Sequence, residues 1–381
     1  MKVGIIGGGI TGLTTALALQ KFGIRVAVYE QAKELNEIGA GIWLQPNAIK
    51  VLDWLGLKEE IKQQGHELHK MEITNAQLVP FKRIKNSVVE DEKGNRTIAI
   101  HRAALQKILF KQLRSSNSVQ LDKKYKEHQI TAEGIRVDFE NGQSQVDLLL
   151  GADGIGSKVR HAIAPNATLR DSGQVCWRGI ADMRLPNEFI NFGKEAWGKQ
   201  IRFGFSPIQK DRVYWFAVAK AQNAQKDRNT DLKAHIYDLF QEFSPAVKEL
   251  IKATKPDAIH QGMLKDLKKI PTWYDNRVCL IGDAAHATTP NMGQGACQGI
   301  EDAYYISHLL AEHISDTNAA FALFEQKRRK KVDTIVNTSW QMGQMAHHKI
   351  AQPIMQFLMR LTPESVINVQ MNKLFHIEKL N

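Results

Sequence analysis

The first residues whose types and spacing could do chemistry are three glycines, Gly7, Gly9 and Gly12, which follow the apolar run 3–6 and open a helical pattern. In such a setting the first glycine permits a tight turn, the second lets the backbone approach a pyrophosphate, and the third allows close packing of helix and strand. Glu30 stands 18 residues past Gly12, at the end of the next apolar run. Its carboxylate can accept hydrogen bonds from ribose hydroxyls and would repel a 2′-phosphate. The pattern therefore predicts an ADP-containing cofactor, FAD or NAD rather than NADP.

Two other apolar runs end in glycine beside aspartate, at Asp153 in Gly-Ala-Asp-Gly and at Asp283 in Gly-Asp-Ala-Ala-His. An aspartate at a strand end can hold ribityl or ribose hydroxyls, although each motif alone is an ordinary junction between a strand and a turn. A glycine-bearing loop follows the second motif and opens a long helical pattern. Free N–H groups at that helix end would stabilise negative charge, such as that of a reduced flavin. The loop residues concerned are Pro290, Gly293, Gly295 and Ala296.

A second kind of candidate lies among aromatic residues in the middle of the chain. Arg202 alternates with Phe203, so the two side chains point to opposite faces of a strand, and Tyr214 follows 12 residues after Arg202. The arginine could hold an anionic substrate or lower the pKa of a phenol, and the tyrosine could orient the substrate or relay its proton. The alternative is a rim arginine and a packing tyrosine. A substrate contact and a surface pair both stay open for Arg178, and His286 is expected to brace its loop by hydrogen bonding.

These residues need a scaffold of alternating strands and helices. Residues 3–29 are typical of one strand–helix–strand unit, and the apolar runs 146–150 and 278–281 predict further buried strands. Helices are expected over 295–313 and over about 230–253. Glycine-bearing segments from both ends of the chain must therefore meet in one nucleotide domain, with the aromatic middle inserted into it. The expected segments are 1–69, 101–171 and 273–345 for the cofactor domain, 70–100 and 172–272 for the substrate domain, and 346–381 for C-terminal helices.

The charge balance of the 381-residue chain limits the class of partner. Lys and Arg number 51 against 40 Asp and Glu, which gives a net charge of +11. Such a balance suits small anions, nucleotides included, as well as nucleic acids or membrane surfaces. The sequence lacks the interleaved aromatic and basic residues that single-strand binders use, so no nucleic-acid partner is expected. The basic run 327–331 is predicted to be the solvated face of a helix.

Cysteine and histidine usage argues against disulfides and metals. Three scattered cysteines favour reduced thiols in the cytoplasm over a disulfide framework or a zinc site. The pair 347–348 of histidines has no carboxylate at metal-ligand spacing, so no metal is predicted. No apolar run reaches the length of about 18 residues that a membrane span needs, and Met1-Lys2 leads directly into a strand rather than a secretory signal. A cytoplasmic protein without stable membrane insertion is expected.

Three motifs, in this order along the chain, are typical of one family. They are the glycine cluster 7–12 with Glu30, the stretch 151–160 (Gly-Ala-Asp-Gly-Ile-Gly-Ser-Lys-Val-Arg), and 282–286 with Pro290 and Gly-Gln-Gly at 293–295. Over nearly its whole length the chain resembles the flavoprotein aromatic-ring hydroxylases of the p-hydroxybenzoate hydroxylase type. Within them it is most similar to the branch with salicylate hydroxylases, FAD-dependent urate hydroxylase and zeaxanthin epoxidase. The resemblance implies an α/β fold with a Rossmann-like FAD-binding domain, an inserted substrate domain made mainly of β-sheet, and a C-terminal helical segment.

The same resemblance implies roles for the cofactor residues. The glycine motif with Glu30 would bind the ADP half of FAD. Asp153 would serve FAD and the use of a nicotinamide cofactor, and Asp283 would bind the ribityl and ribose part. Arg102 matches a family arginine on the pyrophosphate side of FAD, with a plain surface cation as the alternative. Gly41 lies in a segment that matches the family strand beside the flavin ring.

The implied chemistry is the transfer of one oxygen atom. Arg202 and Tyr214 match an arginine and a tyrosine that face substrate in the urate-hydroxylating branch. FAD would stay bound, whereas NADH or NADPH would dock transiently, because the sequence has no second glycine fingerprint. Reduced flavin would add the co-substrate O2 as a C4a-hydroperoxide and hydroxylate a small aromatic or heteroaromatic substrate, in a monomer or homodimer. The alternatives are an epoxidase or antibiotic-modifying monooxygenase, and a flavin-binding carrier or escort protein without redox turnover.

Overall fold

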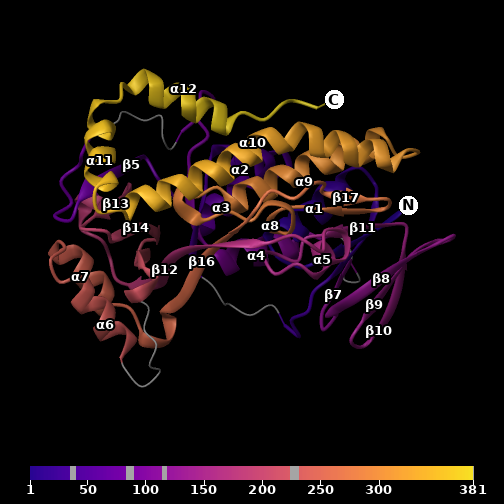
Figure 1. The fold of residues 1–381 in the computed structure, drawn as a ribbon, viewed down its shortest axis with the longest axis horizontal. Coiled ribbons are helices and arrows are strands. Elements are labelled where there is room, and N and C mark those ends of the chain that lie inside the picture. Colours follow the sequence, from indigo (N-terminus) through magenta and orange to yellow (C-terminus); the bar gives the residue numbers. More distant parts are fainter. Residues whose placement is uncertain (35–39, 83–89, 114–117, 224–230, 381) are drawn as a thin grey trace.

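The computed structural model of the protein describes residues 1–34, 40–82, 90–113, 118–223 and 231–380. It is a mixed α/β structure with two six-stranded sheets in the described part of the chain, and the predicted fold class is confirmed. Figure 1 shows the longest helix, α10 (Thr317–Ala346), running lengthwise across the molecule. The helices α11 (Ala351–Leu361) and α12 (Glu364–Phe375) follow it, and α12 turns back along α10.

The first sheet joins segments that lie far apart in the sequence. Its strand order is β17-β18-β11-β1-β2-β7, all parallel except β17, which pairs antiparallel with β18. The apolar runs beginning at 3, 146 and 278 therefore supply three adjacent strands, as expected from their glycine-bearing ends. The strands are β1 (Lys2–Ile6), β2 (Arg25–Tyr29), β7 (Val119–Gln120), β11 (Leu148–Gly151), β17 (Tyr274–Asp275) and β18 (Val278–Leu280).

Helices on this sheet bury its apolar strands and approach one another closely. A Cβ atom added to Gly299 would lie 2.1 Å from Oγ1 of Thr11, so α1 and α9 can touch at this point only with a glycine. The side chains of Val3, Leu149 and Leu280 are fully buried between the layers. The helices are α1 (Ile10–Lys21), α2 (Pro46–Trp54), α3 (Lys58–Gln64), α4 (Arg102–Lys111), α5 (Lys158–Ile163), α8 (Asp283–His286) and α9 (Gly295–Glu312).

Two three-stranded sheets complete this part of the molecule. One has the order β3-β6-β4 and the other β10-β9-β8. Trp43 on β3 donates its Nε1–H to Oγ of Ser206 at 2.8 Å, which fastens the first of these sheets to the second large sheet. The strands are β3 (Gly41–Leu44), β4 (His66–Glu67), β6 (Ile98–His101), β8 (Tyr125–Thr131), β9 (Gly134–Phe139) and β10 (Gly142–Val146).

The second large sheet has the order β16-β12-β15-β14-β13-β5 and is antiparallel except for the β5–β13 pair. Because side chains alternate along a strand, Phe203 and Trp215 face α6 and α7, while Arg202 and Tyr214 face the opposite side. The predicted pairing of the strands that carry Arg202 and Tyr214 is confirmed. The strands are β5 (Lys70–Asn75), β12 (Leu169–Asp182), β13 (Phe192–Trp197), β14 (Arg202–Gln209), β15 (Arg212–Lys220) and β16 (His260–Leu267).

The single helix expected over about 230–253 is wrong. The described residues form two helices, α6 (Leu232–Leu239) and α7 (Pro245–Lys252), separated by a short turn. Pro245 occupies the first turn of α7, where its missing N–H costs nothing, and it could not continue α6. The turn folds the two helices against each other over the aromatic face of the sheet.

Candidate functional site

The glycine loop between β1 and α1 combines tight packing with open space. Gly7 has φ of +109°, and a Cβ there would lie 2.4 Å from the carbonyl oxygen of Ala152. A Cβ on Gly12 would lie 2.0 Å from the carbonyl oxygen of Gly7, so helix and loop need both glycines. A Cβ on Gly9 meets no described atom within 4 Å. The loop therefore leaves room at the N-terminus of α1, where free N–H groups favour a phosphate.

Glu30 lies beside this loop in a fixed orientation. Its Oε2 accepts the N–H of Gly8 at 2.7 Å, and its Oε1 accepts the N–H of Ala32 at 2.9 Å. Gln106 on α4 donates to the carbonyl oxygen of Gly8 at 2.7 Å and holds the loop from the other side. Each carboxylate oxygen keeps a second lone pair for a hydroxyl donor. Glycine loop and acid together fit the ADP half of a dinucleotide.

The Asp153 motif and the Asp283 motif are joined by Arg160. Asp153 accepts hydrogen bonds from Oγ of Ser157 at 2.5 Å and from the N–H of Lys158 at 2.8 Å, so both of its oxygens brace the start of α5. The guanidinium of Arg160 is buried and donates to the carbonyl oxygen of Ala284 at 3.1 Å. The structure thus gives Asp153 a bracing role inside its own loop, and its service to a cofactor stays a prediction.

Asp283 follows β18 and reaches a space that is also lined by β3 and by the second large sheet. Its side chain is accessible from this space even though protein atoms surround it on most sides. This desolvation raises the pKa of Asp283, while the charges of His286, Arg102 and Arg160 act to lower it. Arg102 is exposed at the first position of α4. It is close enough to Asp283 for its positive charge to lower the pKa of that carboxyl group. A carboxylate placed in this way can accept hydrogen bonds from the hydroxyls of a ribityl chain.

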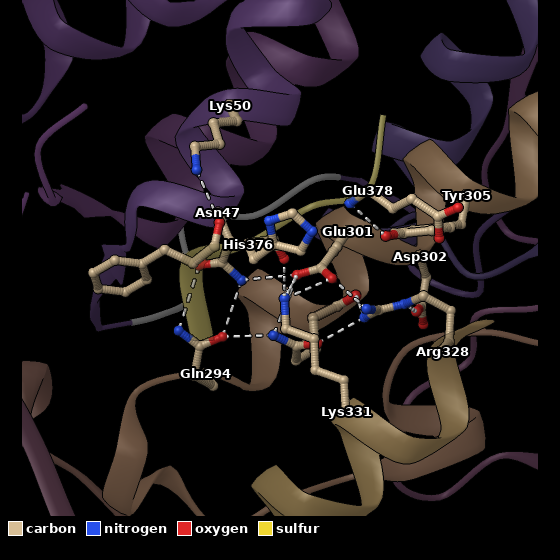
Figure 2. A network of polar contacts seen from close by, with 12 residues as sticks. Asn47, Lys50, Gln294, Glu301, Asp302, Tyr305, Arg328, Lys331, His376 and Glu378 are labelled. Atoms are coloured by element: carbon tan, nitrogen blue, oxygen red, sulfur yellow. Dashed lines mark hydrogen bonds and ion pairs between the residues drawn. The ribbon is translucent and has the colours of Figure 1, made fainter. Parts of the chain in front are cut away.

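A buried network of ion pairs joins α9 to α10. Arg328 donates its Nε–H to Asp302 at 2.8 Å and its Nη1–H to Glu301, and Lys331 donates to both oxygens of Glu301 at 2.8 and 2.9 Å (Figure 2). The acids and Arg328 are almost completely buried. The prediction that the run 327–331 is a solvated face is wrong for these two cations, because acids on the neighbouring helix draw them inward.

Asp302 links this network to the loop that follows β18. His286 Nε2 lies 2.6 Å from Oδ2 of Asp302, which also accepts the N–H of Gly282 at 2.8 Å. Burial acts to raise the pKa of Asp302, but the charges and hydrogen bonds of His286 and Arg328 outweigh it and lower that pKa to about 2. The predicted bracing role of His286 is confirmed. Through these contacts to Gly282 and His286, Asp302 holds the loop that carries Asp283 in place.

One cavity of about 520 Å³ brings the cofactor loops and the second large sheet together. One wall of this cavity comes from β3 and the loop before α9, and the other from the polar face of β12, β13, β14 and β15. Eight of the residues predicted from the sequence line it: Gly41, Arg202, Tyr214, Asp283, Pro290, Gly293, Gly295 and Ala296. The flavin-side and substrate-side predictions therefore describe one continuous space.

Tyr214 packs against the flavin-side wall of this cavity. A Cβ on Gly41 would lie 2.3 Å from Cγ of Tyr214, so the tyrosine ring rests directly on the glycine backbone. Burial raises the pKa of the Tyr214 phenol, and the hydrogen-bonded Arg178 offsets only part of this rise. The hydroxyl therefore stays protonated at neutral pH. It can donate a hydrogen bond to a substrate oxygen or nitrogen.

The side chain of Arg202 is buried and hydrogen-bonded to two other side chains, which the sequence did not predict. It is 2% exposed, and its Nη1–H donates to Glu195 at 2.9 Å while its Nη2–H donates to Asn291 at 2.5 Å. Its Nε has no hydrogen-bond partner among the described residues. Because Glu195 already balances its charge, Arg202 does not present an unpaired positive charge to the cavity.

Sequence reasoning missed Glu195 and Asn291 and left Arg178 undecided. Arg178, Glu195 and Asn291 all line the cavity. Glu195 occupies the position opposite Gly204 on β14, two residues along from Arg202 and on the same face. Strand alternation in 192–197 could have placed Glu195 on the polar face, but only the register shows that it meets Arg202.

A mainly parallel sheet with a glycine loop, joined through one cavity to a second sheet with a polar face, is typical of flavin-binding proteins. The chain matches the FAD binding domain family over residues 1–339, and it belongs to this family. It is therefore a flavoprotein.

Similar proteins include an aurachin C monooxygenase/isomerase of Stigmatella aurantiaca, which is 34% identical over 91% of this chain and 90% of its own length. A 2-heptyl-3-hydroxy-4(1H)-quinolone synthase of Pseudomonas aeruginosa is 30% identical over 91% of this chain and 89% of its own. The structure also resembles that of Klebsiella pneumoniae HpxO in complex with FAD and uric acid. The TM-score is 0.89 at 27% identity, covering 98% of this chain and 96% of HpxO.

No group of three or more His, Cys, Asp or Glu side chains within the described ranges is placed to hold a metal ion. None of the helices described is long and apolar enough to cross a membrane.

Proposed function

We propose that the protein is an FAD-dependent monooxygenase, using NADH or NADPH, that hydroxylates an aromatic or heteroaromatic ring. The observation that carries this proposal is the shared cavity, in which the flavin-side residues Gly41, Asp283 and Gly295 face Arg178 and Tyr214 across one space. FAD, when bound and reduced, supplies activated oxygen from O2. The monooxygenase name of the aurachin C relative, and the FAD and uric acid bound to HpxO, support the same reaction class.

The cofactor half of the chain would bind and orient FAD. Gly9 and the N-terminus of α1 would receive the pyrophosphate, Glu30 the adenosine ribose, and Asp283 the ribityl chain. Gly293 precedes α9, Gly295 is its first residue, and both line the cavity. The positive N-terminal end of α9 would therefore face negative charge on the flavin ring. We assign Asp153 and Arg102 to the support of this cofactor site. NADH or NADPH would dock transiently, and the oxygen-transfer route implied by the resemblance stays a prediction.

The polar face of the second sheet would orient the substrate. The Tyr214 hydroxyl, kept protonated by burial, would donate to an oxygen or nitrogen of the ring system, and Arg178 would hold the tyrosine in place. Arg202 would position the site through its hydrogen bonds to Glu195 and Asn291. We place the protein in the cytoplasm, as a monomer or homodimer acting on a small molecule.

The test uses the purified protein loaded with FAD and a panel of urate, hydroxybenzoates and 4-quinolones. The proposal predicts that at least one compound accelerates oxidation of NADH or NADPH and gains one oxygen atom, as read by mass spectrometry. A protein that binds FAD and accepts no hydride with any of these rings would instead be a carrier or escort.

A further inference from the structure

We propose that the outer half of the cavity binds a flexible hydrocarbon chain carried by the substrate's ring. This inference rests on the proposed function, since the ring itself would lie at the polar end beside the flavin. It narrows the substrate class from any aromatic ring to a ring with an alkyl or prenyl tail.

The outer walls of the cavity are made mainly of half-buried apolar side chains, and β5, α10, α11 and α12 each contribute a methionine. Five of the ten methionines of the chain line this one space. Each of these side chains keeps accessible surface toward the cavity. The half-buried apolar residues are Met71, Ile73, Phe81, Met292, Met342, Met359, Ile367 and Met371.

The apolar region begins directly beside the polar end. Ile73 on β5 pairs in register with Glu195, the partner of Arg202. Met342 on α10 precedes Gly343, where a Cβ would lie 2.5 Å from Nδ2 of Asn291. A ring held by Tyr214 and Arg178 would therefore have its far edge against an apolar passage rather than against solvent.

The C-terminal helices close this passage from outside. Met359 from α11 and Ile367 and Met371 from α12 supply its far wall. Lys82 donates a hydrogen bond to the carbonyl oxygen of Thr362, between α11 and α12, and so fastens these helices to the segment that follows β5. The passage is continuous with the polar end of the same cavity and is covered on one side by these helices, which favours a tail of the bound substrate as its occupant.

Methionine suits an alkyl or prenyl chain. Its unbranched, polarisable side chain adapts to irregular apolar shapes, and it recurs on surfaces that accept several ligands. A small polar ring alone would leave these side chains facing water. At the polar end, Glu195 already balances the charge of Arg202, so this arginine does not by itself require an anionic substrate.

The first experiment measures dissociation constants on the FAD-loaded protein, from flavin absorbance, for two homologous series. These are 4-quinolones with methyl, propyl, pentyl or heptyl chains at carbon 2, and the corresponding n-alkyl esters of 4-hydroxybenzoate. Each buried methylene is worth up to about fourfold in affinity, so the heptyl member of at least one series should bind on the order of 100-fold more tightly than the methyl member. Equal affinity along both series, or no binding in either, would overturn the inference.

Affinity and turnover separate this inference from the proposed function. A length-dependent dissociation constant without ring hydroxylation would support the passage and contradict the monooxygenase. Hydroxylation of urate or methyl compounds with no dependence on chain length would do the reverse.

A pair of variants on one helix tests the location. Met342→Trp fills the passage and should reduce the heptyl-to-methyl affinity ratio to about tenfold or less. Met345→Trp, at an exposed position of the same helix outside the cavity, should keep the wild-type ratio. Met371→Trp on α12 repeats the test from the other wall, and FAD content checks that each variant is folded. A wild-type ratio in both Met342→Trp and Met371→Trp would place the tail elsewhere.

Discussion

The ring of Tyr214 rests on the backbone of Gly41, with Cγ only 2.3 Å from where a glycine Cβ would be. This contact joins the strand expected beside the flavin to the strand that carries the substrate tyrosine. Both residues also line the cavity. A substitution at Gly41 should therefore disturb both β3, the strand expected beside the flavin, and the position of Tyr214 on β15.

Gly41→Ala should destabilise the fold by about 1–3 kcal/mol, because the added methyl must push the tyrosine ring aside. Thermal unfolding and substrate affinity of the FAD-loaded protein should both fall. Gly262→Ala is the matched control, since a Cβ there meets no described atom within 4 Å. Equal stability and affinity in the two variants would show that the contact is loose.

Gly9→Ala and Gly12→Ala should separate cofactor binding from folding. The Gly12 variant should unfold at a lower temperature even without FAD, because its Cβ would clash with the carbonyl oxygen of Gly7. The Gly9 variant should fold normally and lose FAD, because its methyl enters only the space assigned to the pyrophosphate. The checks are the unfolding midpoint without FAD and the flavin content after purification. Full FAD content in Gly9→Ala would contradict the assignment.

Removing Arg202 alone should be costly. Arg202→Met leaves Glu195 buried without its cation, which typically costs about 3–5 kcal/mol in the free energy of unfolding. Adding Glu195→Gln, which removes the charge and keeps an acceptor for Nε1 of Trp197, should recover most of this loss. Urea unfolding of the wild type, both single variants and the double variant measures the coupling. Additive losses would mean that the ion pair does not matter to the fold.

Tyr214→Phe should leave FAD content unchanged and slow hydroxylation. Loss of one hydrogen bond to a charged or developing charged group is worth roughly 1.5–3 kcal/mol, which corresponds to a rate on the order of 10- to 100-fold lower. More of the NADH or NADPH consumed should then appear as hydrogen peroxide. Wild-type rate and coupling in the variant would reduce Tyr214 to a packing residue.

Asp302 should contribute to stability with a defined dependence on pH. Its pKa in the folded protein, about 2, lies below the ordinary value of 3.8, so its stabilisation is fully present above about pH 4 and is lost as the pH falls through 2. Asp302→Asn should therefore be less stable than wild type by a margin that shrinks between about pH 4 and pH 2. A margin that is constant over this window would contradict the depressed pKa.

The sequence predicted the strand–loop–helix setting of the glycine motif well because its signals are local. Gly7 is favoured by its own φ of +109°, Gly12 is required by a backbone contact to Gly7 five residues before it, and Glu30 follows the next strand of the same unit. The first large sheet also follows from apolar runs that must share one buried layer.

What the sequence did not predict depends on long-range register. Glu195 and Asn291 meet Arg202 only because β13, β14 and the loop before α9 converge, and Asn291 lies 89 residues from Arg202. Likewise, Arg328 and Lys331 resemble surface cations until α9 places Glu301 and Asp302 beneath them. The Met-rich passage is assembled from segments between 71 and 371 and has no local pattern.

We propose that the FAD-loaded protein transfers one oxygen atom from O2 to a ring bound in this cavity. The most direct measurement is turnover of the FAD-loaded protein under oxygen-18 gas, with NADH or NADPH and the tightest-binding ring from the panel. The account predicts a hydroxylated product with one oxygen-18 atom, formed in proportion to the reduced nicotinamide consumed. Oxidation of the nicotinamide to hydrogen peroxide alone, or a product whose new oxygen comes from water, would contradict it.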